Sequence, residues 1–534
     1  ISVVDTGMDD RGPYLHLEML GVQEDLQALL SSWIEQQSDS FAKGMPSGAD
    51  RATPGAATHS ARVTDLDVRH TPIARFELRR DVHFHDGHPL DAEDVLFTYN
   101  ALMLDENLSP RRSDFEPIEQ LRILDPYRLE VHYKDLYSQA LAIWTIGILP
   151  AHRFTSAGTQ ATEDPAGRTT GLQVREHPAN ATPIGTGPFK FVSWLADERI
   201  SLQRFREHWQ HGTGFDSVHI RIVPDTLSRE LEFQAGAADV YTPEPHQVSR
   251  YRTSNDYQLL DSLRMGYTFI GYNLRRPPFD DVRVRQALGM AVNVDELVEY
   301  VLFGEGVRVT GPYPVSTPYY PSGLAPLPYD PQQAVELLEQ AGFQRGADGY
   351  RARDGRPLAI TLITNNGNPR RKAILSVVQN AWKRIGVRCE TRVFEWSVFL
   401  GDYIDKNDFD AVVLGWVLGV DPDQRALWHS SQTDPKELNF VGYSDPEVDR
   451  WLDAIRRTSK LQRQIDYTHR IHKRIAEAQP YTFLFAPRAT YALDKRIEMV
   501  ERDAIVPVRA AAGDVYFFFE HWLRPGAAGP YLTQ

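Results

Sequence analysis

The sequence predicts an α/β protein that is divided into two or three domains. Its 534 residues exceed the size at which a single hydrophobic core stops growing. From about residue 262 onward, helices with polar N-caps and terminal glycines alternate with short apolar strands. Helices that lie between strands in this way pack on the faces of a sheet, which gives a layered α/β domain.

The composition excludes several functional classes. Hydrophobic residues make up 42% of the chain and charged residues 24%, as is typical of a globular protein. The 58 basic and 72 acidic residues give a net charge of −14, so the chain lacks the cationic field that binds nucleic acid. Cys389, on a predicted strand, is the only cysteine, which excludes an internal disulfide and a thiolate zinc cluster. No apolar run reaches the length of a membrane span.

The N-terminal region gives few structural signals. The chain begins at Ile1, so we expect that a leader or a longer N-terminus has been removed. Residues 40–71 are rich in Gly, Ala, Ser and Thr, which predicts a surface loop or a flexible insertion. Before that loop, one amphipathic helix is predicted by four residues on a single helical face, Leu26, Leu29, Leu30 and Trp33.

The remainder of the first half predicts strands, turns and two helices. Alternating apolar residues predict strands at 74–79, within 117–150, after the glycine turn at 185–187, and at 217–223. Asp86-Gly87 is a turn signal. One helix is predicted to begin after the N-cap Asp91, and another carries Leu227, Leu231 and Phe233.

The second half predicts four longer helices with clear end signals. Asn, Asp and Pro mark the starts of helices, and glycine marks their ends. The first two helices run from Asn293 to Gly304 and from Asp330 to Gly342. The third has an apolar face that starts at Ile374 and ends at Gly386, and the fourth begins at Asp445.

The stretch Phe409–Asp423 is the centre of the predicted site. Ala411–Trp416 is a short β-branched apolar run, which predicts a buried strand. The strand ends in Gly415-Trp416 and opens into a loop without a charge until Asp421. The residues alone also allow an ordinary core strand followed by a turn.

The order of motifs along the chain resembles one known family. It is similar to the extracytoplasmic peptide-binding proteins of ABC importers, in their oligopeptide, dipeptide and nickel branch. The similarity covers roughly residues 74–500. It rests on FELR and VHFHDGHPLDAEDV within 76–95, GTGPF at 185–189, Asn273 with PPFD at 277–280, VRQAL at 284–288, AVELLEQAG at 334–342, Gly415-Trp416 with Asp421-Pro422-Asp423, and Asn439 with YSDPEVD at 443–449.

This resemblance implies a two-lobed periplasmic-binding-protein clamshell of type II, with an extra domain inserted in lobe one. Lobe one would be discontinuous and consist of residues 1–44, 170–262 and 491–534. The inserted domain would span 45–169, and lobe two would span 263–490. The implied protein is a periplasmic or cell-surface monomer without a cofactor, which passes its solute to a membrane permease.

The resemblance also implies how the ligand is bound. The strand that ends in Gly-Trp would pair with the main chain of an extended peptide, as in β-augmentation. Hinge closure would then remove the ligand from water. The candidate ligand contacts are Gly415, Trp416, Val417, Gly419, Asp421, Tyr272, Asn273, Trp396 and Trp194. The loop Asn365–Asn368 is interpreted as a turn, with a ligand-facing loop as the alternative.

One position departs from the family pattern. Many peptide-binding relatives carry an Asp three residues after the tryptophan, where it pairs with the ligand's free ammonium. In this chain that position is Gly419. A buried ammonium without a carboxylate partner is unfavourable. An oligosaccharide or a metal chelate therefore remains an alternative ligand.

A metal site and a hydrolase are two further alternatives. His83, His85 and His88 lie close together in the sequence, but no fourth ligand can be assigned to them. His429 lies nearer to the expected ligand loop. The chain has no G-x-S-x-G, H-E-x-x-H or G-x-x-x-x-G-K motif, so no catalytic residue and no metal ligand is predicted.

Overall fold

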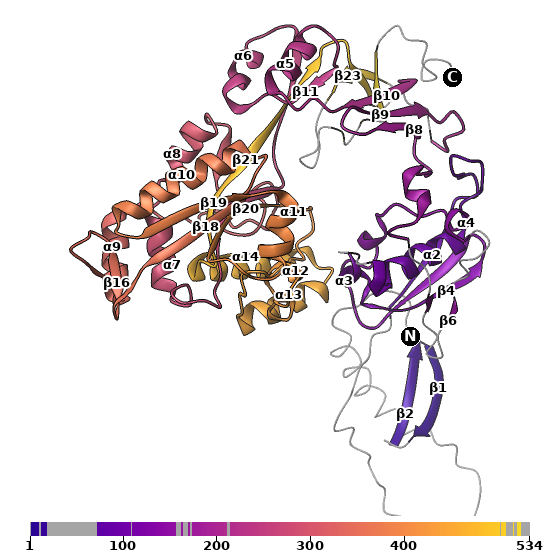
Figure 1. The fold of residues 1–534 in the computed structure, drawn as a ribbon. Coiled ribbons are helices and arrows are strands. Elements are labelled where there is room, and N and C mark those ends of the chain that lie inside the picture. The colour runs from indigo at the N-terminus through magenta and orange to yellow at the C-terminus, as the bar shows by residue number, and fades with distance from the viewer. Residues whose placement is uncertain are drawn as a thin grey trace, which may run out of the picture.

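The structure is a computed structural model, and its ribbon is shown in Figure 1. It describes residues 2–9, 12–18 and 72–524, with gaps at 108, 110, 156–161, 164–168, 171–173, 211–213, 502–503, 509–515, 517–518 and 520. The predicted helix at Leu26–Trp33 and the predicted loop at 40–71 lie outside these residues.

The largest sheet is covered on both faces. Its strand order is β11-β21-β13-β20-β18-β19, and β12 and β14 pair with β21. Val412 and Leu414 of β20 enter one hydrophobic core, whereas Ala411 and Val413 enter the other. This arrangement explains why β20 reads as a continuous apolar run rather than an alternating one. The strands are β11 Val240–Tyr241, β12 Tyr257–Leu263, β13 Gly266–Tyr272, β14 Gly306–Arg308, β18 Ala359–Asn365, β19 Arg388–Phe394, β20 Ala411–Val417 and β21 Tyr481–Asp494.

Two groups of helices supply the two cores. One face is covered by α7 (Val282–Met290), α9 (Pro331–Gln340) and α10 (Pro369–Arg384). The other is covered by α13 (Pro446–Arg456) and α14 (Leu461–Ala478). In Figure 1 these elements form the large orange body.

The predicted helix ends are confirmed in detail. Asp330 and Asp445 accept hydrogen bonds from backbone N–H groups in the first turns of α9 and α13, which is the N-cap geometry. Asn293 caps α8 (Val294–Glu296) in the same way. Gly304 and Gly386 adopt positive φ angles of 79° and 85°, as expected where a helix stops.

The first half of the chain forms two further sheets and several helices. The order β3-β5-β4 packs under α2, which begins after the N-cap Asp91. A second sheet has the order β10-β9-β8. The elements are β3 Ile73–Glu77, α2 Ala92–Met103, α3 Arg112–Phe115, β4 Ile118–Asp125, β5 Arg128–Tyr133, α4 Ala151–Phe154, β8 Phe189–Leu195, β9 Arg199–Arg204, β10 Ser217–Arg221, α5 Thr226–Gln234 and α6 Val248–Arg252.

The remaining strands form small separate pairs and triplets. They are β1 Ser2–Asp9 with β2 Gly12–Glu18, β6 Thr162–Glu163 with β7 Thr169–Thr170, the group β15 Gln344–Arg345, β16 Arg351–Arg353 and β17 Arg356–Pro357, and the group β22 Glu498–Glu501, β23 Ala504–Pro507 and β24 Trp522–Leu523.

Two paired segments connect the large body to the α5–α6 region. β21 pairs with β13 at its start and with β12 and β11 at its end. The break between β12 and β13 spans only Arg264 and Met265. In Figure 1, β21 is the long strand that runs from the orange body towards α5 and α6. A crossing made of two adjacent strands is a suitable hinge, because a few backbone angles can change without disturbing either core.

Candidate ligand-binding site

A cavity lies at the end of β20, beside the strand crossing. Its volume is about 110 Å³, and Gly415, Trp416 and Val417 form part of its wall. A second cavity of about 590 Å³ adjoins it through the shared residues Asn368 and Arg370. The second cavity is lined from one side by Pro224, Thr226, Arg229 and Glu244, and from the other by residues 365–370, Lys372 and Val393. The two cavities together form a cleft between the two parts of the molecule.

The outer edge of β20 is open towards this cleft. β18 pairs with β20 at only two positions, Leu362 with Ala411 and Ile363 with Val412. On the opposite edge, β13 pairs with β20 along its whole length. The N–H of Leu418 donates to the carbonyl oxygen of Met265 at 2.7 Å.

This bond fixes which backbone groups of β20 face outward. Hydrogen-bonded pairs alternate along an antiparallel ladder, so Trp416 bonds to β13 while Gly415 and Val417 point to the open edge. The hydroxyl of Thr364 donates to the carbonyl oxygen of Val413 at 2.8 Å, which places Val413 on the same outward side. Gly415 and Val417 therefore present main-chain donors and acceptors to the cleft.

Glycine at 415 keeps this edge accessible. A Cβ atom there would lie 2.9 Å from the carbonyl oxygen of Tyr267 and 3.5 Å from Nη2 of Arg371. A larger residue would therefore push against β13 and against a side chain that lines the cleft.

Trp416 is shared between the cavity wall and the core. Its ring centroid lies 5.8 Å from that of Phe440 and 6.3 Å from that of Phe269. Its Nε1–H donates to the hydroxyl of Tyr481 at 3.3 Å. The ring therefore supports the end of β20 as well as lining the cleft.

The loop after β20 is held by partly buried charges. The N–H of Asp423 donates to Oδ1 of Asp421 at 2.7 Å, and the Asp423 carboxylate pairs with Arg456 at 2.6 Å. Burial raises the pKa of Asp421 to about 6. The hydrogen bond from the Asp423 N–H opposes this rise, and the negative charge of Asp423 adds to it. Gly419 and Asp421 lie two and four residues after Val417, and neither lines either cavity.

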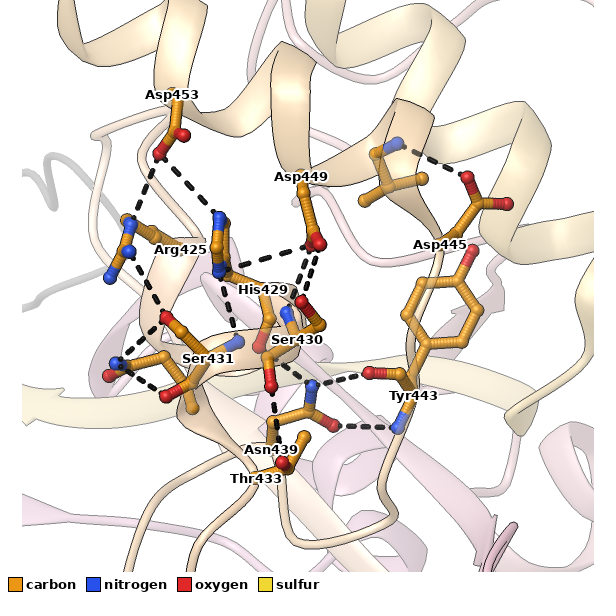
Figure 2. A network of polar contacts seen from close by, with 12 residues as sticks. Arg425, His429, Ser430, Ser431, Thr433, Asn439, Tyr443, Asp445, Asp449 and Asp453 are labelled. Carbon is orange, nitrogen blue, oxygen red and sulfur yellow. Dashed lines mark hydrogen bonds and ion pairs between the residues drawn. The ribbon is translucent and has the colours of Figure 1, made fainter.

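Figure 2 shows the polar network that fixes the next turn of chain. Ser430 donates to the Asp449 carboxylate through its backbone N–H at 2.9 Å and its hydroxyl at 2.5 Å. The N–H of Ser431 donates to Nδ1 of His429 at 3.1 Å, and Arg425 bonds to Asp453 at 3.2 Å. These contacts tie the segment after the ligand loop to α13.

The structure places two of the predicted wall residues away from the cleft. Tyr272 is fully buried, and its hydroxyl bonds to that of Thr482 at 2.7 Å. Asn273 is 1% exposed and donates to the carbonyl oxygens of Asn407 and Phe409. Both lie at the end of β13 that is paired with Ala411, away from Gly415–Val417, because the strands are antiparallel.

The two other predicted tryptophans do not line the cavities. Trp396 begins α11 (Trp396–Val398), packs on Phe399 and is 45% exposed. Trp194 lies on β8 and is 63% exposed. Of the predicted contacts, the structure thus gathers only Gly415, Trp416 and Val417 at the cleft.

Three arginines of the cleft were not predicted from the sequence. Arg264 lies at the strand crossing, and Arg370 and Arg371 lie in the first turn of α10. The positions of Arg370 and Arg371 were the one signal in the sequence for these residues, because cations in the first turn of a helix oppose the helix dipole and are unfavourable there. The loop Asn365–Asn368 forms both the turn that was predicted and part of the cleft wall, and Asn368 caps α10.

The histidines of the first half are engaged in local contacts. Nδ1 of His85 accepts the N–H of Gly185, and Nε2 of His85 lies 2.9 Å from the carbonyl oxygen of Gly187. His88 stacks on His152 with a centroid distance of 4.1 Å. In the part of the chain that the structure describes, no three His, Cys, Asp or Glu residues are grouped so as to hold a metal ion.

The fold and the cleft define a class of protein. A two-lobed α/β fold with a cleft beside a two-strand crossing is a clamshell solute-binding fold. The family model for bacterial extracellular solute-binding proteins, family 5 (middle region), matches residues 72–437. The chain belongs to this family.

Known relatives support the same assignment. The oligopeptide-binding protein AppA of Bacillus subtilis is 31% identical over 431 residues, which cover 79% of this chain and 77% of AppA. The glutathione-binding protein GsiB of Pectobacterium atrosepticum is 27% identical over 432 residues, which cover 79% and 78%. The heme-binding protein A of Haemophilus influenzae is 29% identical over 290 residues, which cover 53% and 51%. The names of these relatives refer to different ligands.

Solved structures share the fold. AppA from Bacillus subtilis in complex with a nonapeptide superposes with a TM-score of 0.73 at 29% identity, over 85% of this chain and 87% of AppA. NikZ from Campylobacter jejuni in complex with Ni(L-His) gives a TM-score of 0.71 at 23% identity, over 85% and 88%, which shows the fold alone. None of the described helices combines the length and apolar character needed to cross a bilayer.

Proposed function

We propose that this chain is the substrate-binding component of an ABC importer, and that it captures an oligopeptide between its lobes and delivers it to a membrane permease. The observation that carries the proposal is the open edge of β20, where Gly415 and Val417 present main-chain groups to a cleft. An extended peptide can add to such an edge as a further strand.

This mode of binding favours a peptide over a rigid solute. Main-chain hydrogen bonds are independent of ligand sequence, so affinity is separated from the choice of side chains. The larger adjoining cavity of about 590 Å³ offers room for ligand side chains. Closure at the β12–β13 and β21 crossing would strengthen the hydrogen bonds by excluding water.

Recognition of a free ligand ammonium at the position of Gly419 is not part of the proposal. Gly419 offers no carboxylate, and Asp421 already accepts a hydrogen bond from Asp423. An oligosaccharide or a metal chelate is the alternative ligand. A ligand-binding screen decides between a peptide and these alternatives.

Related properties follow from the family and are proposed with it. The protein would act outside the cytoplasm, as a monomer without a cofactor or a catalytic step. Lobe one would comprise 1–44, 170–262 and 491–534, the inserted domain 45–169, and lobe two 263–490.

One substitution tests the main-chain pairing directly. Val417→Pro removes a cleft-facing N–H, and proline is tolerated at a strand edge whose N–H faces away from the sheet. The Val417 side chain is 83% exposed, so little packing changes. We expect the affinity for peptide to fall by about fivefold, which is the worth of one ordinary hydrogen bond.

The control keeps the backbone donor. Val417→Ala changes only the exposed side chain, so its affinity should match that of the unmodified protein. Isothermal titration with mixed peptide libraries, and mass spectrometry of ligand released by denaturation, identify the ligand class. A protein that binds sugars or chelates and ignores every peptide would refute the proposal, as would equal affinities of Val417→Pro and Val417→Ala.

A further inference from the structure

A second contact joins the large body to the domain built on β3, β5 and β4, away from the strand crossing. The docking loop, residues 135–138, follows β5 and lies against the C-terminal end of α13. The N–H of Ser138 donates to the carbonyl oxygen of Arg456 at 2.5 Å, and Asp135 forms an ion pair with Arg457 at 3.4 Å. In Figure 1, α3 of the same domain faces α13 below the crossing. The molecule is therefore joined at two separate places.

The docking loop supplies a donor to the end of a helix. Arg456 is the last residue of α13, and a helix leaves its last four carbonyl groups without an intrahelical partner. The Ser138 N–H bonds to one of these groups. Water would replace this donor if the loop moved away, so the bond contributes only the modest net stability of an ordinary hydrogen bond.

Arg456 connects the docking loop to the loop after β20. Its Nε pairs with the Asp423 carboxylate at 2.6 Å, and the two side chains are only 15% and 10% exposed. Its Cζ lies 5.8 Å from the ring centroid of Tyr137, a buried residue in the core of the β3–β5–β4 domain. A guanidinium over an aromatic face is attracted by the ring. One side chain thus contacts the ligand-side loop and the opposite domain.

The charges around Arg456 favour the docked arrangement. Burial lowers the pKa of Arg456, but attraction by Asp423, Tyr137 and Asp114 outweighs this effect, so the pKa is raised. Tyr137 and Asp114 belong to the β3–β5–β4 domain, and Asp423 belongs to the large body. Separation of the two parts would remove two of these three attractions, and no ligand takes part in any of them.

We propose that the docking loop is a clasp that holds the cleft closed, and that the cleft opens only when residues 135–138 leave the end of α13. The β3–β5–β4 domain moves with β8, because His85 contacts Gly185 and Gly187 and accepts a hydrogen bond from Lys190. Rotation at the strand crossing therefore pulls the docking loop away from α13. The clasp raises the closed population before a ligand arrives, so the ligand has to supply less of the closing free energy.

The ion pair between Asp135 and Arg457 provides the test, because both side chains are more than half exposed and lie outside the cores. Asp135→Arg and Arg457→Asp each place like charges at the contact, and the double variant restores the pair in the reverse order. Spin labels attached through Glu119→Cys on β4 and Arg470→Cys on α14, both exposed positions, report the distance between the two parts. Cys389→Ser removes the native thiol from every variant. Pulsed dipolar electron paramagnetic resonance then measures the distance distribution of the ligand-free protein.

We expect each single charge reversal to raise the ratio of open to closed molecules by about fivefold, and the double variant to return most of the population to the closed distance. The effect of the single reversals should shrink as salt rises. Lys406→Asp is the matched control. It breaks an ion pair of similar exposure, Lys406 with Asp402, inside the large body, and should leave the distance distribution unchanged.

Two results would overturn the clasp. One is a distance distribution for both single reversals that matches that of Lys406→Asp. The other is a double variant that stays as open as the single reversals. The measurement needs no ligand, so either result leaves the peptide-binding proposal standing, whereas a failed peptide screen leaves the clasp untouched. Thermal melts of each variant confirm that a longer distance reflects opening and not unfolding.

Discussion

Replacement of Trp416 tests whether the end of β20 is built as the structure shows. The ring stacks near Phe269 and Phe440 and bonds to Tyr481. Trp416→Ala would open a gap in the aromatic cluster, and nothing in the rigid neighbouring strands can move to fill it. The packing therefore predicts a loss of stability in addition to any loss of ligand affinity.

The expected loss follows from the buried area. A tryptophan side chain buries up to about 250 Å², and this ring is partly exposed, so about 150 Å² leaves water on folding. At about 25 cal/mol per Å² this amounts to about 4 kcal/mol, which is an upper estimate because the unfolded chain is partly compact. We expect Trp416→Ala to lower the free energy of unfolding of this lobe by about 3 kcal/mol and its Tm by about 6–12 °C.

Two variants provide the controls. Trp396→Ala removes the same side chain type from a position that is 45% exposed, so it should cost less than about 1 kcal/mol. Trp416→Phe keeps an aromatic ring but loses the Tyr481 hydrogen bond, which is worth about 1 kcal/mol. Scanning calorimetry and urea unfolding followed by circular dichroism measure the losses. Equal melting of Trp416→Ala and Trp396→Ala would refute the packing argument.

Two pH-dependent predictions concern buried titratable groups. The pKa of the Asp421 carboxyl group is raised from 3.8 to about 6, so the folded state binds its proton more tightly than the unfolded state does. The free energy of unfolding therefore falls as the pH rises from about 4 to about 6. Asp421→Asn should therefore stabilise the protein by up to about 3 kcal/mol at pH 7–8 and have little effect near pH 4, and a Tm gain of the same size at both pH values would contradict this account. His472 is fully buried, and its pKa is lowered from 6.5 to about 3. The unfolded state therefore binds the proton at a higher pH than the folded state does. As a result, the free energy of unfolding falls by up to roughly 5 kcal/mol as the pH drops from about 6.5 to about 3. A His472→Gln variant should lose less stability over this acid range in urea titrations, and an unchanged pH profile would show that His472 is not held neutral.

The sequence by itself determined most of the local structure. Asp330 and Asp445 predict the starts of their helices from the sequence alone, because an N-cap hydrogen bond joins residues only two or three positions apart. The continuous apolar run of β20 predicted a buried strand, because each face of the strand packs in one of the two hydrophobic cores. The family resemblance implied that Gly415, Trp416 and Val417 contact the ligand, and the structure places all three at the cleft.

Only the tertiary structure decided how distant segments meet. Tyr272 and Asn273 were predicted as ligand contacts, but the antiparallel pairing of β13 with β20 carries them to the opposite end from Gly415. Arg264 and Arg371 come from separate segments, yet chain packing brings both to one cavity. Local sequence fixes backbone preferences over a few residues, whereas the charge of a cleft depends on which distant side chains the packed sheets and helices place around it.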